Sequence, residues 1–398
     1  MFLKNFNNLA IFVKNTNFAT HFLNITDKMK NLLLFILSIL APLSLHSQDI
    51  YTAGSYTNSD GSKAAAVFKN GVVIYSLKQD GKDLFSSAMA IDTTNNDIYW
   101  SLNSNPVGSI SDGYGCVMRN DEIVLDNMPG TCINDISLDG GDIYSAGYMN
   151  DIYNATAAVW KNGDTTPLYT YCADQNYSEV LGIDVVNGVV YACGFFEQGL
   201  RTGCVWVNGE LYATYPNCKV TDIAYHNGDI YYVVSECLST VYKSGERLYN
   251  MYNHYGGECS DVNDLKVVND DVYAVGFLGY NDCLAWKNGD LLYLHPFALD
   301  ADFRACCFYD QSLYYVGWDH ENHGVVFKDG ELLYSLDNSL FYDVWAMPNP
   351  LAVAEIETEE SSEVLIYDIF GQPVNNNILL LGFYIIKRGN KVTKFYKN

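Results

Sequence analysis

The stretch GDIYSAGYMNDIYNATAAVWKNGDTTPLYTY, residues 141–171, contains the pattern from which the fold follows. It holds an apolar-Tyr run at Ile143-Tyr144, a second run at Val159-Trp160, and a further apolar-Tyr pair at Leu168-Tyr169. Between the last two stands Asn162-Gly163, a dipeptide typical of two-residue hairpins, because both central positions of a type I′ turn need positive φ. The stretch therefore predicts short β-strands joined by tight turns.

The same pattern repeats along the chain at intervals of 40 to 48 residues. The apolar-Tyr run occurs seven times, at Ile50-Tyr51, Ile98-Tyr99, Ile143-Tyr144, Val190-Tyr191, Ile230-Tyr231, Val272-Tyr273 and Leu313-Tyr314. A second apolar run follows each copy, at Val67, Val117, Val159, Val205, Val241, Ala285 and Val326. An apolar first-strand residue precedes the Tyr by eight positions in six places, at Ile91, Ile136, Ile183, Ile223, Leu265 and Cys306. Four short strands at such a period are typical of a propeller blade.

The ends of the repeat predict how the ring closes. The first copy, Ile50-Tyr51, is a second strand without a first strand, and Asp343-Val344 is a first strand without successors. If the two lie side by side they complete one sheet, and closure removes an edge that would otherwise promote aggregation. We therefore predict an all-β, seven-bladed β-propeller over residues 48–347, closed by the N- and C-terminal strands in one blade.

Composition limits the classes of partner. Lys and Arg number 23 against 47 Asp and Glu, which gives a formal net charge of −24. An acidic surface repels phosphate backbones, so no nucleic-acid partner is expected. The 32 Tyr residues favour strands and half-wet surfaces.

The N-terminal residues have the composition of a targeting segment. We interpret residues 1–28 as an upstream mis-start and residues 29–47 as a signal peptide, with a short basic start, the apolar run Leu32 to Leu40 and a small residue at Ser47. The alternative is a membrane anchor, but the run is shorter than the ~20 residues of a span. We predict no stable membrane span, and a secreted or outer-cell-surface location.

Residues 348–398 differ in composition and suggest a linker followed by a small C-terminal β domain. The chain there contains Pro348-Asn349-Pro350, the core Ile366 to Gln372, the run Leu381 to Lys387 and a Lys-rich end, Lys391 to Lys397. This segment resembles the C-terminal sorting domain of the type IX secretion system of Bacteroidota. The resemblance implies type IX secretion machinery as a partner and says nothing of what the propeller binds.

Eleven Cys in an exported chain leave two interpretations open. Several occupy small or apolar positions of the repeat, where a free Cys behaves as a small hydrophobe. Alternatively, Cys193 with Cys204 and Cys237 with Cys259 could form disulfides. The odd total leaves at least one thiol unpaired in a monomer.

The long connections of a propeller lie on one face, beside the mouth of its channel, and binding usually resides on such loops. Aromatic residues with a few polar groups suit a glycan or an extended protein segment. The candidate ligand-binding residues are Tyr148, Arg201, Tyr255, Arg304, Trp318 and His320. In contrast, one position of the repeat holds Trp160, Trp206 and Trp286, and this recurrence predicts that their side chains are buried in the core.

Four Asp precede the first-strand apolar residue: Asp135, Asp222, Asp264 and Asp343. Such carboxylates either accept hydrogen bonds from nearby backbone amides or ring the channel mouth and hold a cation such as calcium. We favour the first interpretation, which leaves the protein without a cofactor.

Catalytic patterns are weak in the sequence: it has no His-Glu-x-x-His, phosphate-binding Gly-rich loop or Gly-x-Ser-x-Gly. The sequence therefore favours a binding or adhesion propeller that recognises a glycan or an extracellular protein through its long-loop face. The alternative is a carbohydrate-active enzyme, a glycoside hydrolase or lyase with carboxylates at the channel mouth.

Overall fold

The computed structural model describes residues 48–104, 113–150, 155–171, 177–235, 238–251, 260–278, 282–296, 301–349, 364–368, 382–388 and 391–397. Asp49–Met347 forms one compact unit, and Met1–Gln48 with Pro348–Asn398 forms a second. The regular elements of the described residues are β-strands. None of the described segments is a helix of the length and apolarity that crossing a membrane requires.

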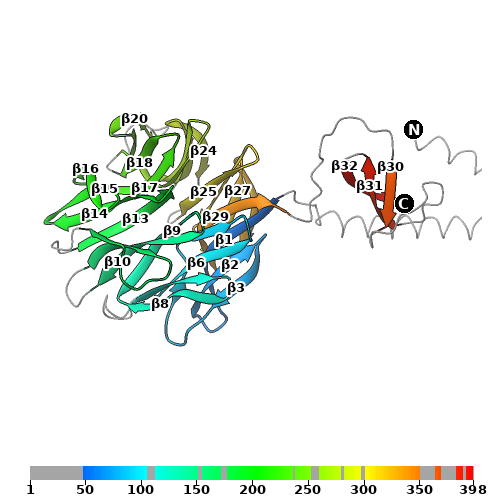
Figure 1. The fold of residues 1–398 in the computed structure, drawn as a ribbon, viewed down its shortest axis with the longest axis horizontal. Helices are drawn as coiled ribbons and strands as arrows, with labels where there is room; N and C mark the ends of the chain where they lie inside the picture. Colours follow the sequence, from blue (N-terminus) through cyan, green and yellow to red (C-terminus); the bar gives the residue numbers. More distant parts are fainter. Residues whose placement is uncertain are drawn as a thin grey trace, which may run out of the picture. The chain divides into compact units, whose positions relative to one another are not determined.

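The described part of Asp49–Met347 consists of antiparallel sheets that follow one another along the chain (Figure 1). The first has the order β29 (Ser339–Pro348), β1 (Gln48–Thr57), β2 (Lys63–Lys69), β3 (Val72–Leu77). The second has the order β4 (Leu84–Phe85), β6 (Asp97–Ser104), β7 (Tyr114–Arg119), β8 (Glu122–Pro129), with β5 (Met89–Asp92) paired to β6.

An eight-stranded sheet comes next and contains two copies of the repeat. One comprises β9 (Thr131–Asp139), β10 (Asp142–Asn150), β11 (Ala155–Lys161) and β12 (Tyr169–Tyr171). The other comprises β13 (Tyr177–Val186), β14 (Val189–Gln198), β15 (Leu200–Val207) and β16 (Glu210–Pro216). The two copies are joined by a parallel pairing of Ala155 with Tyr177.

Three four-stranded sheets complete the unit. They comprise β17 (Lys219–His226), β18 (Asp229–Ser235), β19 (Thr240–Lys243) and β20 (Glu246–Asn250); β21 (Ser260–Val268), β22 (Asp271–Leu278), β23 (Asp282–Lys287) and β24 (Asp290–Pro296); and β25 (Asp302–Tyr309), β26 (Ser312–Trp318), β27 (Gly324–Lys328) and β28 (Glu331–Leu336). In the second unit, β30 (Val364–Asp368), β31 (Gly382–Arg388) and β32 (Lys391–Lys397) form an antiparallel sheet.

The two ends of the propeller segment share one sheet. Strand β29 is hydrogen-bonded beside β1, as the register of the repeat predicts. The Thr57 N–H donates to the Asn338 carbonyl at 2.8 Å, and Ile50 and Val344 belong to one apolar cluster with Phe341. A repeated four-stranded antiparallel sheet, with one sheet built from both chain ends, is the organisation of a β-propeller.

The polar residues of the repeat form the same clasp in successive sheets. Asn162 Oδ1 accepts the Ile143 N–H at 2.8 Å, and its Nδ2 donates to Asp142 at 2.7 Å. Lys161 pairs with Asp142 at 2.7 Å and lies 5.0 Å from the Tyr144 ring centroid. The same ion pair recurs as Lys69–Asp49, Arg119–Asp97, Lys243–Asp229 and Lys287–Asp271. These repeated polar side chains therefore hold the second strand to the following hairpin turn.

Glycine recurs after the Tyr because the first strand approaches closely there. The first strand carries a bulge between Val262 and Asp264 in the β21–β22 pair. A Cβ on Gly276 would lie 1.9 Å from the Asp261 carbonyl oxygen, and one on Gly317 would lie 1.8 Å from that of Asp302. Any side chain at these positions would have to displace backbone.

The prediction that Ile91 is the first-strand residue of the second sheet is wrong. In the second sheet, Met89 rather than Ile91 pairs with the residue that follows the repeated Tyr, as Ile183 does with Ala192 in its own sheet. The turn after Asp92 is longer than the Asn187-Gly188 turn. Counting eight residues back from Tyr99 therefore ends two positions too late.

The core contains the residues that repeat at equivalent positions. Trp160, Trp206 and Trp286 are buried, as predicted. Cys193 is a buried free thiol, so the disulfide with Cys204 that the sequence left open as an alternative does not form. Cys237 and Cys259 lie outside the described residues.

Candidate functional site

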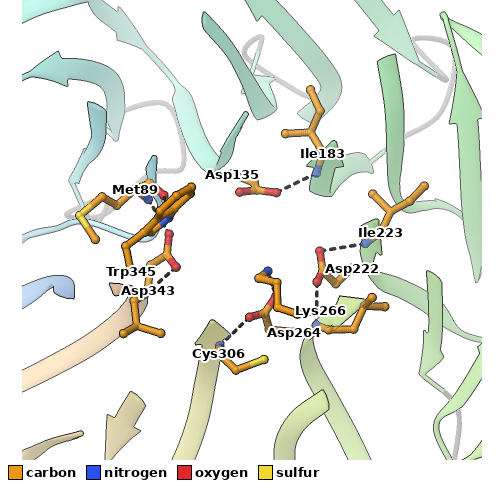
Figure 2. A network of polar contacts seen from close by, with 12 residues as sticks. Met89, Asp135, Ile183, Asp222, Ile223, Asp264, Lys266, Cys306, Asp343 and Trp345 are labelled. Atoms are coloured by element: carbon orange, nitrogen blue, oxygen red, sulfur yellow. Dashed lines mark hydrogen bonds and ion pairs between the residues drawn. The ribbon is translucent and has the colours of Figure 1, made fainter. Parts of the chain in front are cut away.

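Four aspartates and one lysine meet where the first strands converge, and we call Asp135, Asp222, Asp264, Asp343 and Lys266 the central ring. Figure 2 shows these side chains pointing into a common space, each from a different sheet except Asp264 and Lys266, which share β21.

Each aspartate of the central ring links one copy of the repeat to the next. Asp135 Oδ1 accepts the N–H of Ile136 in its own strand, and its Oδ2 accepts the N–H of Ile183 in β13, both at 2.8 Å. The same two-amide arrangement joins Asp222 to Ile223 and Leu265, and Asp343 to Val344 and Met89; Asp264 accepts the N–H of Cys306. The prediction that these carboxylates accept backbone N–H groups is thus confirmed, and the second N–H belongs to the next copy of the repeat.

Lys266 supplies a positive charge within the ring. Its Nζ lies 2.7 Å from Asp264 Oδ1, and its side chain is 43% exposed. Burial opposes ionisation of Asp264, but the Lys266 ammonium holds its pKa below the usual value. Burial raises the pKa of Asp343 to about 8 and that of Asp135 to about 6, and burial with the Asp264 charge raises the pKa of Asp222.

The arrangement of the ring gives no support to the calcium interpretation. Within the part of the chain that the structure describes, no group of three or more His, Cys, Asp or Glu side chains could hold a metal ion. The ring oxygens face backbone N–H donors, and Lys266 provides a cation of the chain's own. Sequence reasoning missed Lys266, because the equivalent first-strand position holds Ser137, Asp184 and Cys307 in other sheets.

A second set of side chains lies at the end of the sheets where second strands finish and first strands begin. The Arg304 group consists of Arg304, Asp302, Trp318, Tyr342 and Phe85. The Arg304 guanidinium lies 4.8 Å from the Trp318 ring centroid and 2.8 Å from Asp302. Trp318 and Tyr342 have centroids 5.3 Å apart, and Tyr342 and Phe85 have centroids 5.8 Å apart. Side chains from three sheets thus form one aromatic strip.

The Asp302 side chain is held in place by Asn263, and its ion pair with Arg304 leaves the Arg304 Nε without a hydrogen-bond acceptor among the described residues. Asn263 Nδ2 donates to Asp302 Oδ1 at 2.8 Å and to the Phe303 carbonyl at 2.7 Å. Burial raises the pKa of Asp302 to about 6, although Arg304 opposes the rise. Arg304 Nε is buried without a hydrogen-bond partner among the described residues, and the side chain as a whole is 39% exposed.

The Arg201 group repeats this chemistry elsewhere on the same end of the sheets. It consists of Arg201, Glu197, Phe195, Tyr177 and Tyr148. Arg201 lies 4.5 Å from the Phe195 ring centroid and donates to Glu197 at 2.7 and 3.0 Å. Phe195 stacks on Tyr177 at 5.7 Å, and Tyr177 contacts Tyr148 at 6.1 Å.

The two groups occupy equivalent register positions. Trp318 lies opposite Asp302, and Phe195 lies opposite Glu179. Glu179 accepts hydrogen bonds from Asn134 Nδ2 and the Tyr177 hydroxyl, and burial raises its pKa. Each group therefore combines aromatic rings, an ion-paired arginine and a carboxylate that accepts a hydrogen bond from an asparagine side chain.

The structure brings together four of the six candidate ligand-binding residues, in two groups. Arg304 and Trp318 share the first group, and Tyr148 and Arg201 share the second. His320 lies on the turn after β26, 43% exposed and 3.8 Å from Glu321, in neither group. Tyr255 lies outside the described residues.

Sequence reasoning missed the residues that complete the groups, chiefly Tyr342, Phe85 and Asp302. Tyr342 directly precedes Asp343, where other first strands have Asn134, Thr221 or Asn263. A departure from the repeat was the available signal, but the sequence does not indicate which departures meet in space.

Comparisons with known proteins give structural likenesses alone. No family model and no curated protein match the chain. It is similar to the WD40 β-propeller domain of Doa1, at 15% identity over 74% of this chain and 93% of that one, with a TM-score of 0.40. It is also similar to the computationally designed Ika8 protein, at 14% identity over 87% and 93%, with a TM-score of 0.44. A complex of KlAtg21 with the coiled coil of AgAtg16 matches at 11% identity over 71% and 98%, with a TM-score of 0.47.

Proposed function

We propose that the chain is a seven-bladed binding propeller whose ligand docks on the end of the sheets that carries the Arg304 and Arg201 groups. The count of seven takes the eight-stranded sheet as two blades, since the pairing of Ala155 with Tyr177 alone joins its halves. The sheet shared by β29 and β1 is then the blade that closes the ring.

The observation that carries this proposal is the contrast between repeated and unrepeated residues. The repeated Asp, Lys and Asn side chains pair with one another in the clasps, and the repeated Gly residues allow close contacts between backbones. Among the described residues the Arg304 and Arg201 groups lie in two places rather than in every copy of the repeat. They bring aromatic rings, partly exposed except for the buried Phe195, together with guanidinium groups. Trp, Tyr and Arg are the side chains that contribute most to binding at protein interfaces.

The hydrogen bonds of the ring carboxylates favour a binding function over a catalytic one. The Asp135 and Asp343 oxygens accept backbone N–H groups of two strands. A glycosidase needs one carboxyl to donate a proton and another to attack or activate water. Carboxylates that are hydrogen-bonded to two copies of the repeat hold these copies together.

The proposal includes export. A chain with a signal peptide at residues 29–47 and a sorting-type segment at residues 348–398 would reach the cell surface or the medium. N-terminal sequencing of the mature protein should find a start just after Ser47. A mature protein that retains residues 1–47 would contradict this part of the proposal.

The binding proposal is tested with the purified full chain against immobilised extracellular polysaccharides and proteins, by biolayer interferometry. Tyr342→Ala, within the Arg304 group, should weaken the strongest interaction by about tenfold, as expected for an interface aromatic. Tyr212→Ala is the matched control, because Tyr212 is 45% exposed on the outer strand β16. Equal losses for both variants, or no interaction with any surface, would refute the proposal.

A further inference from the structure

We infer that the Arg304 group is a subsite for a neutral, hydroxyl-rich glycan, with Trp318 and Tyr342 against the sugar ring and the exposed part of Arg304 on its hydroxyls. This inference rests on the proposed function and names the ligand class of the same surface.

The charge state of Arg304 is the first argument. An unpaired guanidinium in a pocket favours carboxylate or phosphate ligands. Arg304 already has a carboxylate partner, since Asp302 lies 2.8 Å away and is held in place by Asn263. The chain also carries a formal net charge of −24. An anionic ligand would therefore meet a neutralised arginine in a negative field.

The hydrogen-bonding capacity of the pair is the second argument. A guanidinium carries five N–H donors and a carboxylate accepts about four hydrogen bonds. Arg304 Nε is buried and the Asp302 side chain is only 10% exposed, whereas the Arg304 side chain as a whole is 39% exposed. A ligand therefore meets the exposed part of Arg304 and not the buried Nε or the Asp302 carboxylate. A neutral sugar hydroxyl can accept a hydrogen bond there without separating the ion pair.

The aromatic strip is the third argument. Trp318, Tyr342 and Phe85 lie in contact, from three different sheets, with centroid separations of 5.3 and 5.8 Å. Each is neither fully buried nor fully exposed. A strip of this kind offers apolar surface to the C–H face of a pyranose while the adjacent Arg304 takes its hydroxyls. Its extension over several sheets suits more than one sugar unit of a polymer.

The experiment uses the full chain in affinity electrophoresis through gels that contain one soluble polysaccharide each. The neutral probes are a mixed-linkage β-glucan, glycogen and a galactomannan, and the acidic probe is polygalacturonate. The variants are Trp318→Ala and Arg304→Lys, which keeps the charge but loses the planar fork. The matched control is Arg119→Lys, because Arg119 is also a half-exposed, ion-paired arginine.

We expect at least one neutral polysaccharide to retard the chain. Trp318→Ala and Arg304→Lys should each raise Kd by about tenfold, and Arg119→Lys should leave it within about twofold. Binding to a neutral ligand should also be nearly unchanged between about 50 mM and about 500 mM salt, because no net charge is paired. If Trp318→Ala lacks a cooperative thermal transition, the conservative Arg304→Lys variant decides.

Three results would overturn the inference but leave the proposed function standing. The first is retardation by polygalacturonate alone, dependent on Arg304 and lost at high salt. The second is binding to a protein surface alone that Tyr342→Ala weakens. The third is retardation by a neutral polysaccharide that both variants leave intact. The absence of any interaction in this experiment and in the interferometry panel would refute both proposals.

Discussion

Replacing Asp135 by Ala should destabilise the protein by about 3 kcal/mol. The change removes the acceptors of two backbone N–H groups, Ile136 in the same strand and Ile183 in the next copy of the repeat, both bonded at 2.8 Å. A hydrogen bond to a charged group contributes about 1.5–3 kcal/mol. Because Asp135 is only partly shielded from solvent, water can compensate in part, and we take the lower end for each bond. Asp135→Asn keeps one acceptor oxygen and should cost about half as much.

The dependence on pH sharpens this prediction. Burial raises the pKa of Asp135 to about 6 from the usual value of 3.8. A raised pKa means that the folded protein binds the proton more tightly than the unfolded chain does. The stability contributed by that proton is therefore present below pH 4 and is lost as the pH rises towards 6. Since Asn cannot ionise, the cost of Asp135→Asn should be larger at pH 4 than at pH 7.

Equilibrium urea unfolding, followed by Trp fluorescence at both pH values, measures these costs. Asp290→Ala serves as the control, because Asp290 is the exposed first residue of β24, and its loss should change stability by less than about 0.5 kcal/mol. If Asp135→Ala were no more destabilising than Asp290→Ala, the proposed role of the ring carboxylates in joining successive copies of the repeat would be wrong.

Further predictions concern the ring and the close backbone contacts. Lys266→Met should destabilise the protein by about 1–2 kcal/mol at pH 7 and by less at pH 3. The reason is that Lys266 lowers the pKa of Asp264, and a lowered carboxyl pKa stabilises the folded state only at pH values where the carboxyl is ionised. Equal costs at both pH values in urea unfolding would contradict this. Excess Ca²⁺ or EDTA should shift Tm by less than about 1 °C in thermal melts, and a rise with Ca²⁺ would show that the ring binds the ion. Gly276→Ala should cost more than about 3 kcal/mol, because its Cβ would lie 1.9 Å from the Asp261 carbonyl oxygen. Gly188→Ala, with φ +76° and open space around it, should cost about 1 kcal/mol in the same assay.

The local sequence pattern was sufficient to predict the strands, the turns and the pairing of the N- and C-terminal strands in one sheet. Asn162-Gly163 and its equivalents adopt positive φ as the turn chemistry requires. The repeated Trp160, Trp206 and Trp286 are buried, and the orphan strand around Val344 pairs beside β1. Each of these features depends on residues that are close in sequence or on the count of strands, so periodicity alone carries them. The count failed at Met89, where a longer turn shifts the register by two residues.

The central ring and the Arg304 group are features that periodicity could not supply. The second partner of Asp135 is Ile183, 48 residues away, and Tyr342 meets Phe85 from the opposite end of the chain. The sequence by itself determined which groups repeat, because every blade must satisfy the same backbone and core demands. Only the tertiary structure decided which unrepeated side chains share a place, because sheets packed around one axis bring together residues whose separation along the chain has no fixed period.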